Sequence, residues 1–193
     1  MSKVIAITGG PCAGKTSALE ELRRRLGDEA CYVAESATDL ILQGIAPWTC
    51  PSMLDFQTRV IALQLEREAA AAEVSPGLIV CDRGLPDSRA YLNADEYAQA
   101  LASNGIDEHG ALARYDAVIH LGSVAKADLA AYTRANNAAR FENAGEAADA
   151  DDRVAAAWSS HPRFVRIPYS ADFGNKIDEL VAVVESVTRS SDS

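Results

Sequence analysis

The chain has 193 residues, of which 48% are hydrophobic and 24% charged, and its formal net charge is −10. This balance is typical of an ordinary globular protein and argues against the disordered and fibrous classes. An acidic chain with only four lysines lacks the basic surface that counterion release from nucleic-acid phosphates requires. We therefore expect no nucleic-acid partner.

Two further features bear on where the protein resides. No stretch approaches the ~20 apolar residues that a membrane-spanning helix requires, and Met1, Ser2 and Lys3 lead directly into a strand-like run. The four cysteines show neither metal-ligand spacing nor a disulfide framework, which is typical of reduced thiols. We expect a cytoplasmic protein without signal peptide or membrane anchor, folded as a single domain over residues 1–193.

Short apolar runs alternate with segments of helical periodicity along the chain. The predicted strands are Val4–Thr8, Cys31–Ala34, Leu78–Cys81, Ala117–Leu121 and Phe164–Ile167. The predicted helices are Lys15–Leu26, Ala37–Gln43, Ser52–Glu73, Ala94–Ser103, Glu146–Trp158 and Asn175–Val187. Parallel strands need crossover connections, so this alternation predicts a mostly parallel sheet with helices on both faces. The predicted fold class is a three-layer α/β/α sandwich.

The first predicted strand runs into a glycine-rich turn with the phosphate-loop pattern GxxxxGK[ST]. The predicted nucleotide-binding residues are Gly9, Gly10, Pro11, Cys12, Ala13, Gly14, Lys15, Thr16 and Ser17. Glycines let backbone N–H groups converge on phosphate oxygens, the start of the helix adds partial positive charge, and Lys15 adds a full one. Thr16 can supply a hydroxyl to Mg²⁺. The pattern thus predicts a local triphosphate site on an acidic protein.

Two carboxylates follow predicted strands and should emerge at the carboxyl edge of the sheet, where ligands of open α/β folds bind. Asp82 ends the third strand and can hold Mg²⁺ opposite the loop or, alternatively, cap the next turn. Glu35 follows the second strand and can serve as the base for an acceptor hydroxyl. The alternative for Glu35 is an acid favoured by the dipole at the start of the next helix.

Further polar residues are candidates for contacting an acceptor. Arg83 follows Asp82 and places a planar cation where an acceptor or a transferring phosphate would lie, or else it forms a structural ion pair. Gln57 and Arg59 lie in the longest predicted helix, where they either bind the acceptor or belong to a solvated face.

Residues from about 123 to 160 are rich in Ala, Asn, Asp and Glu and too poor in apolar residues to form a core of their own. We interpret them as a helical lid. Arg134 and Arg140 in this lid can stabilise the charge of a transferring phosphoryl group, or they are solvated surface residues. We expect a solvated helix start, rather than a metal site, at the acidic residues Glu142, Glu146, Asp149, Asp151 and Asp152.

The run Asn175-Lys176-Ile177-Asp178 spells the NKxD signature with which GTPases read guanine. Apolar residues keep helical spacing through this run, and the chain has Asp82-Arg83-Gly84 where a GTPase has DxxG. We interpret the match as coincidence. We expect the loop from Pro168 to Phe173 to contact the nucleotide base instead.

Several motifs together resemble a known family. They are the strand and phosphate loop from Ile5 to Thr16, Glu35-Ser36-Ala37-Thr38, Phe56-Gln57, the run from Asp82 to Asp87, Arg140-Phe141-Glu142, and the run from Ala157 to Pro162. The chain resembles the AAA-type P-loop family that groups ribosylnicotinamide kinase domains of bifunctional NAD-biosynthesis proteins with TRPL-translocation-defect ATPases. It is similar, more distantly, to thymidylate and deoxynucleoside kinases, although these have DR-aromatic or ER-Ser forms in place of Asp82-Arg83-Gly84. The resemblance implies strand order 2-3-1-4-5, an arginine-bearing lid after the fourth strand, and binding of ATP and Mg²⁺.

Two functional hypotheses follow. In the first, the protein is an ATP-dependent kinase of a small nucleoside- or riboside-like molecule, in which Thr16 and Asp82 hold Mg²⁺ and Glu35 or Asp82 receives the acceptor proton. Lys15, Arg83 and the lid arginines would then stabilise the transferring charge. In the second, it is a nucleotide-operated regulatory ATPase or GTPase-like protein with no small-molecule acceptor. The pattern is compatible with ATP and with GTP, and it predicts no oligomeric state.

Overall fold

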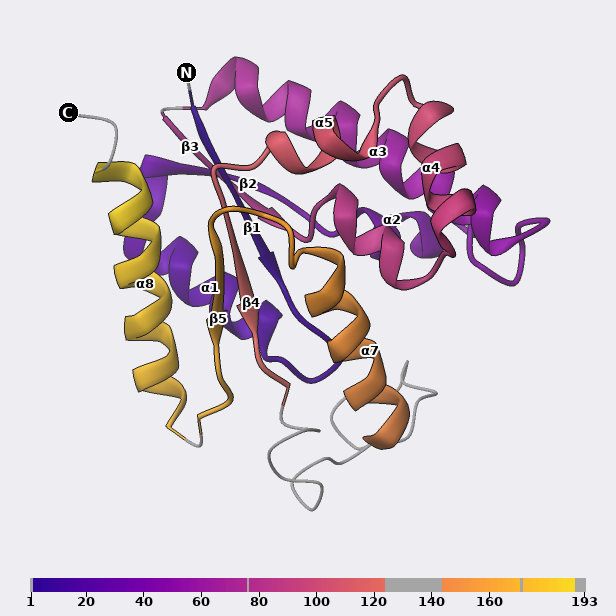
Figure 1. The fold of residues 1–193 in the computed structure, drawn as a ribbon. Helices are drawn as coiled ribbons and strands as arrows, with labels where there is room; N and C mark the ends of the chain where they lie inside the picture. The colour runs from indigo at the N-terminus through magenta and orange to yellow at the C-terminus, as the bar shows by residue number, and fades with distance from the viewer. Residues whose placement is uncertain (1, 76, 124–143, 171, 190–193) are drawn as a thin grey trace.

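A parallel five-stranded sheet forms the centre of the molecule (Figure 1). The computed structural model describes residues 2–75, 77–123, 144–170 and 172–189. The strands are β1 (Lys3–Thr8), β2 (Ala30–Val33), β3 (Leu78–Asp82), β4 (Ala117–Leu121) and β5 (Phe164–Ile167). Their order is β2-β3-β1-β4-β5, and each neighbouring pair is parallel. The expected α/β/α class and the order 2-3-1-4-5 are confirmed.

Helices cover both faces of this sheet. They are α1 (Lys15–Leu26), α2 (Ser36–Leu42), α3 (Met53–Val74), α4 (Ala94–Ala102), α5 (Glu108–Ala113), α7 (Ala144–Ala157) and α8 (Phe173–Arg189). Successive side chains of a strand point to opposite faces. Ile5 of β1 therefore packs with Leu22 of α1 and Leu180 of α8, whereas Ala6 packs with Trp158, which directly follows α7. Figure 1 shows α1 and α8 on one side of the sheet and α3 and α7 on the other.

The structure adds short elements that the periodicity did not predict. They are α5 and the two 3₁₀ helices η1 (Gly27–Glu29) and η2 (Leu85–Ala90). The other elements begin and end within a few residues of their predicted bounds. Of the predicted lid, α7 packs against η2, while Arg134 and Arg140 lie outside the described residues. Among the described helices, none combines the length and the apolar character that crossing a membrane requires.

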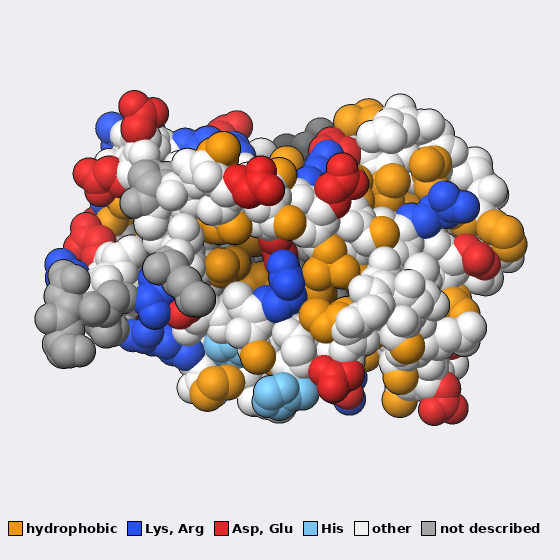
Figure 2. All heavy atoms as spheres, turned by 90° about the horizontal axis from the view of Figure 1, so that it is seen from above, with side chains coloured by type: hydrophobic (Ala, Val, Ile, Leu, Met, Phe, Trp, Pro, Cys, Tyr) orange, Lys and Arg blue, Asp and Glu red, His pale blue; other side chains and the backbone are white. Residues whose placement is uncertain are grey.

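Figure 2 shows one face of the molecule, on which acidic and basic side chains lie side by side. The expected absence of a nucleic-acid partner stays a prediction. The topology itself has a direct functional consequence. Since all five strands are parallel, Thr8, Val33, Asp82 and Leu121 end at the same edge of the sheet. The turns after β1, β2 and β3 therefore meet there.

Candidate phosphate-binding and acceptor site

The turn between β1 and α1 has the backbone of a phosphate loop. Gly9 has φ +145°, and a Cβ at this position would lie 2.4 Å from the carbonyl oxygen of Leu121, so only glycine fits. Gly14 has φ +76° and directly precedes the first residue of α1. The first amides of α1 lack partners within the helix, so together with the helix dipole they provide the donors that anion binding requires.

Lys15 lies across this loop. Its Nζ donates hydrogen bonds to the carbonyl oxygens of Gly9 at 2.9 Å and Gly10 at 3.4 Å. Burial and, secondarily, the positive charge of Arg83 lower the pKa of Lys15 to about 8. The ammonium group is thus poorly solvated, and phosphate oxygens would provide better partners than two carbonyl groups.

Asp82 ends β3 beside the loop. Burial and the charge of Glu35 raise its pKa to about 6, and its Oδ1 is buried without a hydrogen-bond partner among the described residues. An orphaned carboxylate oxygen fits a hard cation such as Mg²⁺, which takes one or two protein carboxylates and completes its shell with phosphate oxygens and water. No cluster of three or more acidic, histidine or cysteine side chains suited to a metal occurs in the described ranges. Asp82 is thus a residue that could hold a metal ion, and Thr16 is the second candidate that the sequence predicts.

Arg83 connects the loop with the turn after β2. Its Nε donates to Oε1 of Glu35 at 2.5 Å, and its Nη1 donates to Oδ1 of Asp87 at 3.0 Å and to the carbonyl oxygen of Gly9 at 3.3 Å. Thr38 donates to the other oxygen of Glu35 at 2.7 Å. Burial alone would raise the pKa of Glu35, but the charges of Arg83 and Lys15 outweigh it and lower the pKa to about 2. Glu35 is therefore ionised.

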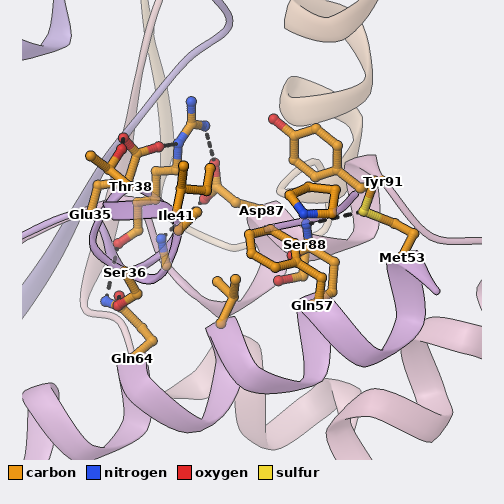
Figure 3. Close-up of a pocket in the computed structure, with 16 residues that line it drawn as sticks. Glu35, Ser36, Thr38, Ile41, Met53, Gln57, Gln64, Asp87, Ser88 and Tyr91 are labelled. Atoms are coloured by element: carbon orange, nitrogen blue, oxygen red, sulfur yellow. Dashed lines mark hydrogen bonds and ion pairs between the residues drawn. The ribbon is translucent and has the colours of Figure 1, made fainter. Parts of the chain in front are cut away.

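A cavity of about 360 Å³ opens beside Glu35 and Arg83, between α2, α3 and η2 (Figure 3). Ser52 caps α3 by accepting a hydrogen bond from the amide of Asp55 at 3.1 Å. Gln57, one turn into this helix, is 5% exposed and lines the cavity. Within the described part of the chain, its amide nitrogen has only the sulfur of Met53, at 3.8 Å, as a hydrogen-bond partner. A buried amide with so weak a partner can bind a ligand group in the cavity.

The cavity has an apolar wall opposite its charged rim. That wall is formed mainly by Ile41, Pro47, Met53, Phe56 and Val60. A site of this kind can bind a ligand that places an apolar part against this wall and polar groups at the charged rim. Arg59 is exposed on α3 and is not part of the lining, so the structure does not bring this candidate to the cavity.

Comparison with known proteins gives the family. A family model described as an AAA domain matches residues 4–175, which is most of the chain. The chain belongs to the AAA-domain family. It is therefore a P-loop protein of the class that comprises ATP-dependent kinases and ATPases, and the resemblance inferred from its motifs is confirmed. No curated protein sequence matches it.

Among solved structures, this AAA domain is similar to two crystal structures of NadR protein. One is in complex with NR, with a TM-score of 0.72, and the other is in complex with NAD and AMP-PNP, with a TM-score of 0.65. Both are 16% identical in sequence and are matched over 97% of this chain. The AAA domain spans 52% and 50% of those NadR chains, respectively. At this identity, the likeness shows the shared fold.

Sequence reasoning missed several residues that hold the AAA domain's site together. Asp151 of α7 is fully buried, not solvated as expected; its Oδ1 accepts from the amide of Gly10 at 2.8 Å and lies 3.2 Å from Nε2 of His120. Lys176, in the NKxD run, is buried and donates to the carbonyl oxygens of Ala13 at 2.8 Å and Gly122 at 3.0 Å. A lysine of the run that we interpret as coincidence thus supports the phosphate loop.

Asp178, the last residue of the NKxD run, agrees with the interpretation as coincidence. Asp178 pairs with Arg25 of α1 at 2.8 Å, on the exposed side of the two helices.

Phe173 at the start of α8 lies near the phosphate loop, since a Cβ at Gly14 would be 3.6 Å from its ring. The loop from Pro168 to Phe173 therefore stays the candidate for the nucleotide base.

Proposed function

We propose that this protein is an ATP-dependent phosphotransferase that moves the γ-phosphate of ATP to a hydroxyl group of a small, riboside-like acceptor. The observation that carries the proposal is the cavity of about 360 Å³, because Arg83 lines it and also donates a hydrogen bond to the carbonyl oxygen of Gly9 in the phosphate loop. A nucleotide switch requires a triphosphate site and a partner surface, whereas a kinase also requires a second, enclosed pocket at the transferring phosphate. The NadR structures in complex with NR and with AMP-PNP support a nucleotide and a small molecule bound to this fold.

The residues of the phosphate loop would bind ATP. The amides of Gly14, Lys15 and Thr16 would donate hydrogen bonds to the phosphate oxygens. The ammonium group of Lys15 would leave its two carbonyl partners and bind phosphate oxygens instead. Thr16 and Asp82 would hold Mg²⁺, which supplies positive charge to the phosphates when bound. Ser17, Cys12 and Ala13 complete the proposed nucleotide-binding stretch.

Glu35 and Arg83 would act on the acceptor. The acceptor oxygen forms a bond to the γ-phosphorus, the bond from phosphorus to the bridging oxygen of ADP breaks, and the hydroxyl proton passes to Glu35. The low pKa of Glu35 rests on Arg83 and Lys15, while its burial acts in the opposite direction. When these two cations turn toward phosphate oxygens, burial prevails and Glu35 becomes a better base. Arg83 would then offset the charge of the transferring group, as would Arg134 and Arg140 of the predicted lid.

Gln57 would orient the acceptor, because its amide can donate and accept hydrogen bonds at the same time. The apolar wall opposite would take the acceptor's flat part. We also propose that the protein acts in the cytoplasm, where ATP is available and cysteine thiols stay reduced.

A screen of nucleosides, ribosides and sugars for acceptor-stimulated ADP release tests the proposal. We expect one class of riboside to stimulate turnover, and we expect Glu35→Gln to abolish this stimulation while calorimetric ATP binding is retained. Gln99→Ala, on α4 and outside the cavity lining, serves as a surface control with unchanged turnover. Tight ATP binding with no stimulation by any compound would instead favour the nucleotide-operated regulatory protein.

A further inference from the structure

Two residues other than glycine have a left-handed backbone in the described part of the chain, Cys12 with φ +60° and Arg83 with φ +70°. This conformation is unfavourable for residues with a Cβ and persists where the surrounding structure enforces it. Cys12 belongs to the phosphate loop. Arg83 follows the last residue of β3 and carries the guanidinium group between Glu35 and the loop. The structure must therefore contain groups that hold the turn of Arg83 in place.

Side chains from three separate parts of the chain bind the backbone of this turn. The carbonyl oxygen of Arg83 accepts from Nε2 of Gln64 at 3.4 Å, the amide of Gly84 donates to Asp87 at 3.1 Å, and the amide of Leu85 donates to the hydroxyl of Tyr115 at 2.9 Å. Two of these side chains, those of Gln64 on α3 and Tyr115 before β4, are remote from the turn in sequence. Both are 4% exposed.

One carboxylate on α3 orients both of these side chains. Glu68 is 4% exposed, and it accepts hydrogen bonds from the hydroxyl of Tyr115 at 2.6 Å and from Nε2 of Gln64 at 3.0 Å. Arg114 donates to its other oxygen at 2.8 Å and balances its charge. Glu68 belongs neither to the cavity lining nor to the phosphate loop.

The direction of each hydrogen bond in this network follows from the donors that are present. A phenolic hydroxyl has one proton, and an ionised carboxylate accepts only, so Tyr115 gives its proton to Glu68 and must present a lone pair to the amide of Leu85. The amide nitrogen of Gln64 donates to Glu68 and Arg83, which leaves its oxygen to accept from Ser36 at 2.8 Å. Ser36 directly follows Glu35. The network thus reaches both partners of the Arg83–Glu35 pair.

We propose that Glu68, Tyr115 and Gln64 form a positioning network that holds the left-handed turn of Arg83 and so places its guanidinium group for phosphoryl transfer. The effect on turnover rests on the proposed function, whereas the effect on the conformation of Arg83 does not. Tyr115 and Glu68 act through Arg83 and do not touch the cavity.

The variant Tyr115→Phe tests this network, because it removes the hydroxyl and keeps the ring that packs edge-on against Trp158 at 5.1 Å between centroids. Tyr97→Phe is its matched control: Tyr97 is 2% exposed, and its hydroxyl has no hydrogen-bond partner in the described structure. For Tyr115→Phe we expect kcat of acceptor-stimulated turnover to fall about tenfold, with KM for ATP changed less than about twofold. Tyr97→Phe should retain the wild-type kcat.

A crystal structure of Tyr115→Phe gives the second readout. We expect Arg83 of the nucleotide-free variant to leave its positive φ, and we expect the affinity for AMP-PNP to be unchanged. Arg83 in its original conformation would overturn the proposal, as would a wild-type kcat. If the wild-type protein shows no acceptor-stimulated turnover, the proposed function fails, and the conformation of Arg83 still decides whether the network positions it.

Glu68→Gln separates positioning from stability. Glutamine keeps an oxygen that accepts from Tyr115 but loses the charge that balances Arg114. We expect Tm to fall in this variant because Arg114 loses its charged partner, and we expect kcat to fall less than in Tyr115→Phe because the hydrogen bond from Tyr115 is kept. A kcat that follows Tm across Tyr115→Phe, Glu68→Gln and Tyr97→Phe would show that the network is only structural and would refute the inference.

Discussion

Replacing Lys15 by methionine should have opposite effects on stability and on nucleotide binding. Burial lowers the pKa of Lys15 from its ordinary 10.5 to about 8, so the folded protein holds the charged form unfavourably. At about 1.4 kcal/mol for each pH unit, this difference corresponds to at most about 3 kcal/mol. The side chain is partly exposed, which reduces the figure, and we expect Lys15→Met to raise the free energy of unfolding by about 1 kcal/mol at pH 7.

The pH dependence of this gain has a definite sign. Below pH 8, Lys15 is protonated in the folded and unfolded states, and the unfavourable burial of its charge is fully present. Between pH 8 and pH 10.5, the unfolded chain binds more protons, so the wild type gains stability as pH rises. The advantage of Lys15→Met should therefore shrink across this window.

Nucleotide binding should change in the other direction. The ammonium group offers charge-assisted hydrogen bonds worth about 3 kcal/mol to the phosphates, so Lys15→Met should weaken ATP binding about 100-fold. Calorimetry with Mg-ATP and thermal unfolding at pH 7 and pH 10 measure both effects. Lys3→Met is the control, because Lys3 pairs with Asp116 at the opposite end of the sheet. An unchanged ATP affinity, or a marked loss of stability at pH 7, would refute this reasoning.

Three further changes test other parts of the site. Asp87→Asn should lower the free energy of unfolding by about 3 kcal/mol, because Asp87 is buried and pairs with Arg83. Denaturant titration measures this loss, and a value under about 1 kcal/mol would contradict the prediction. The pH profile of kcat/KM should fall on its acid side near pH 6, where Asp82 becomes protonated and loses its attraction for a cation; a profile flat down to pH 5 would argue against its role. Lys176→Met should weaken ATP binding about tenfold, because the carbonyl oxygen of Ala13 in the phosphate loop loses its hydrogen bond. An affinity equal to that of the wild type by calorimetry would show that the loop keeps its conformation without Lys176.

The sheet and the phosphate loop could be predicted from sequence because their signals are local. Each strand is a short apolar run bounded by breakers, and parallel pairing follows from the helices between them. The loop from Gly9 to Thr16 combines backbone requirements with charge in eight consecutive residues, and the φ angles at Gly9 and Gly14 agree with it. The short helices η2 and α5 escaped prediction because they are too short to show a period.

The parts of the site that could not be predicted depend on distant residues. Asp151 looks like a solvated acid in its Asp-rich run, and its contact with Gly10 spans 141 positions. Tyr115 donates a hydrogen bond to Glu68, which lies 47 positions away in the sequence. The residues next to either of them in sequence form no motif that would predict this contact. Arg59 lies two residues after Gln57 on α3, and the rotation of the helix between them turns its side chain away from the cavity. A polar residue type alone does not reveal which side of the helix it occupies.

Position 84 follows Arg83 and has no room for a side chain. A Cβ there would lie 2.7 Å from Cζ of Tyr115 and 2.9 Å from the ring of Trp158. Two rings from remote parts of the chain thus occupy the space that a side chain at position 84 would need. The sizes of residues 84, 115 and 158 therefore depend on one another. A larger residue at position 84 requires smaller residues at positions 115 and 158 in the same variant.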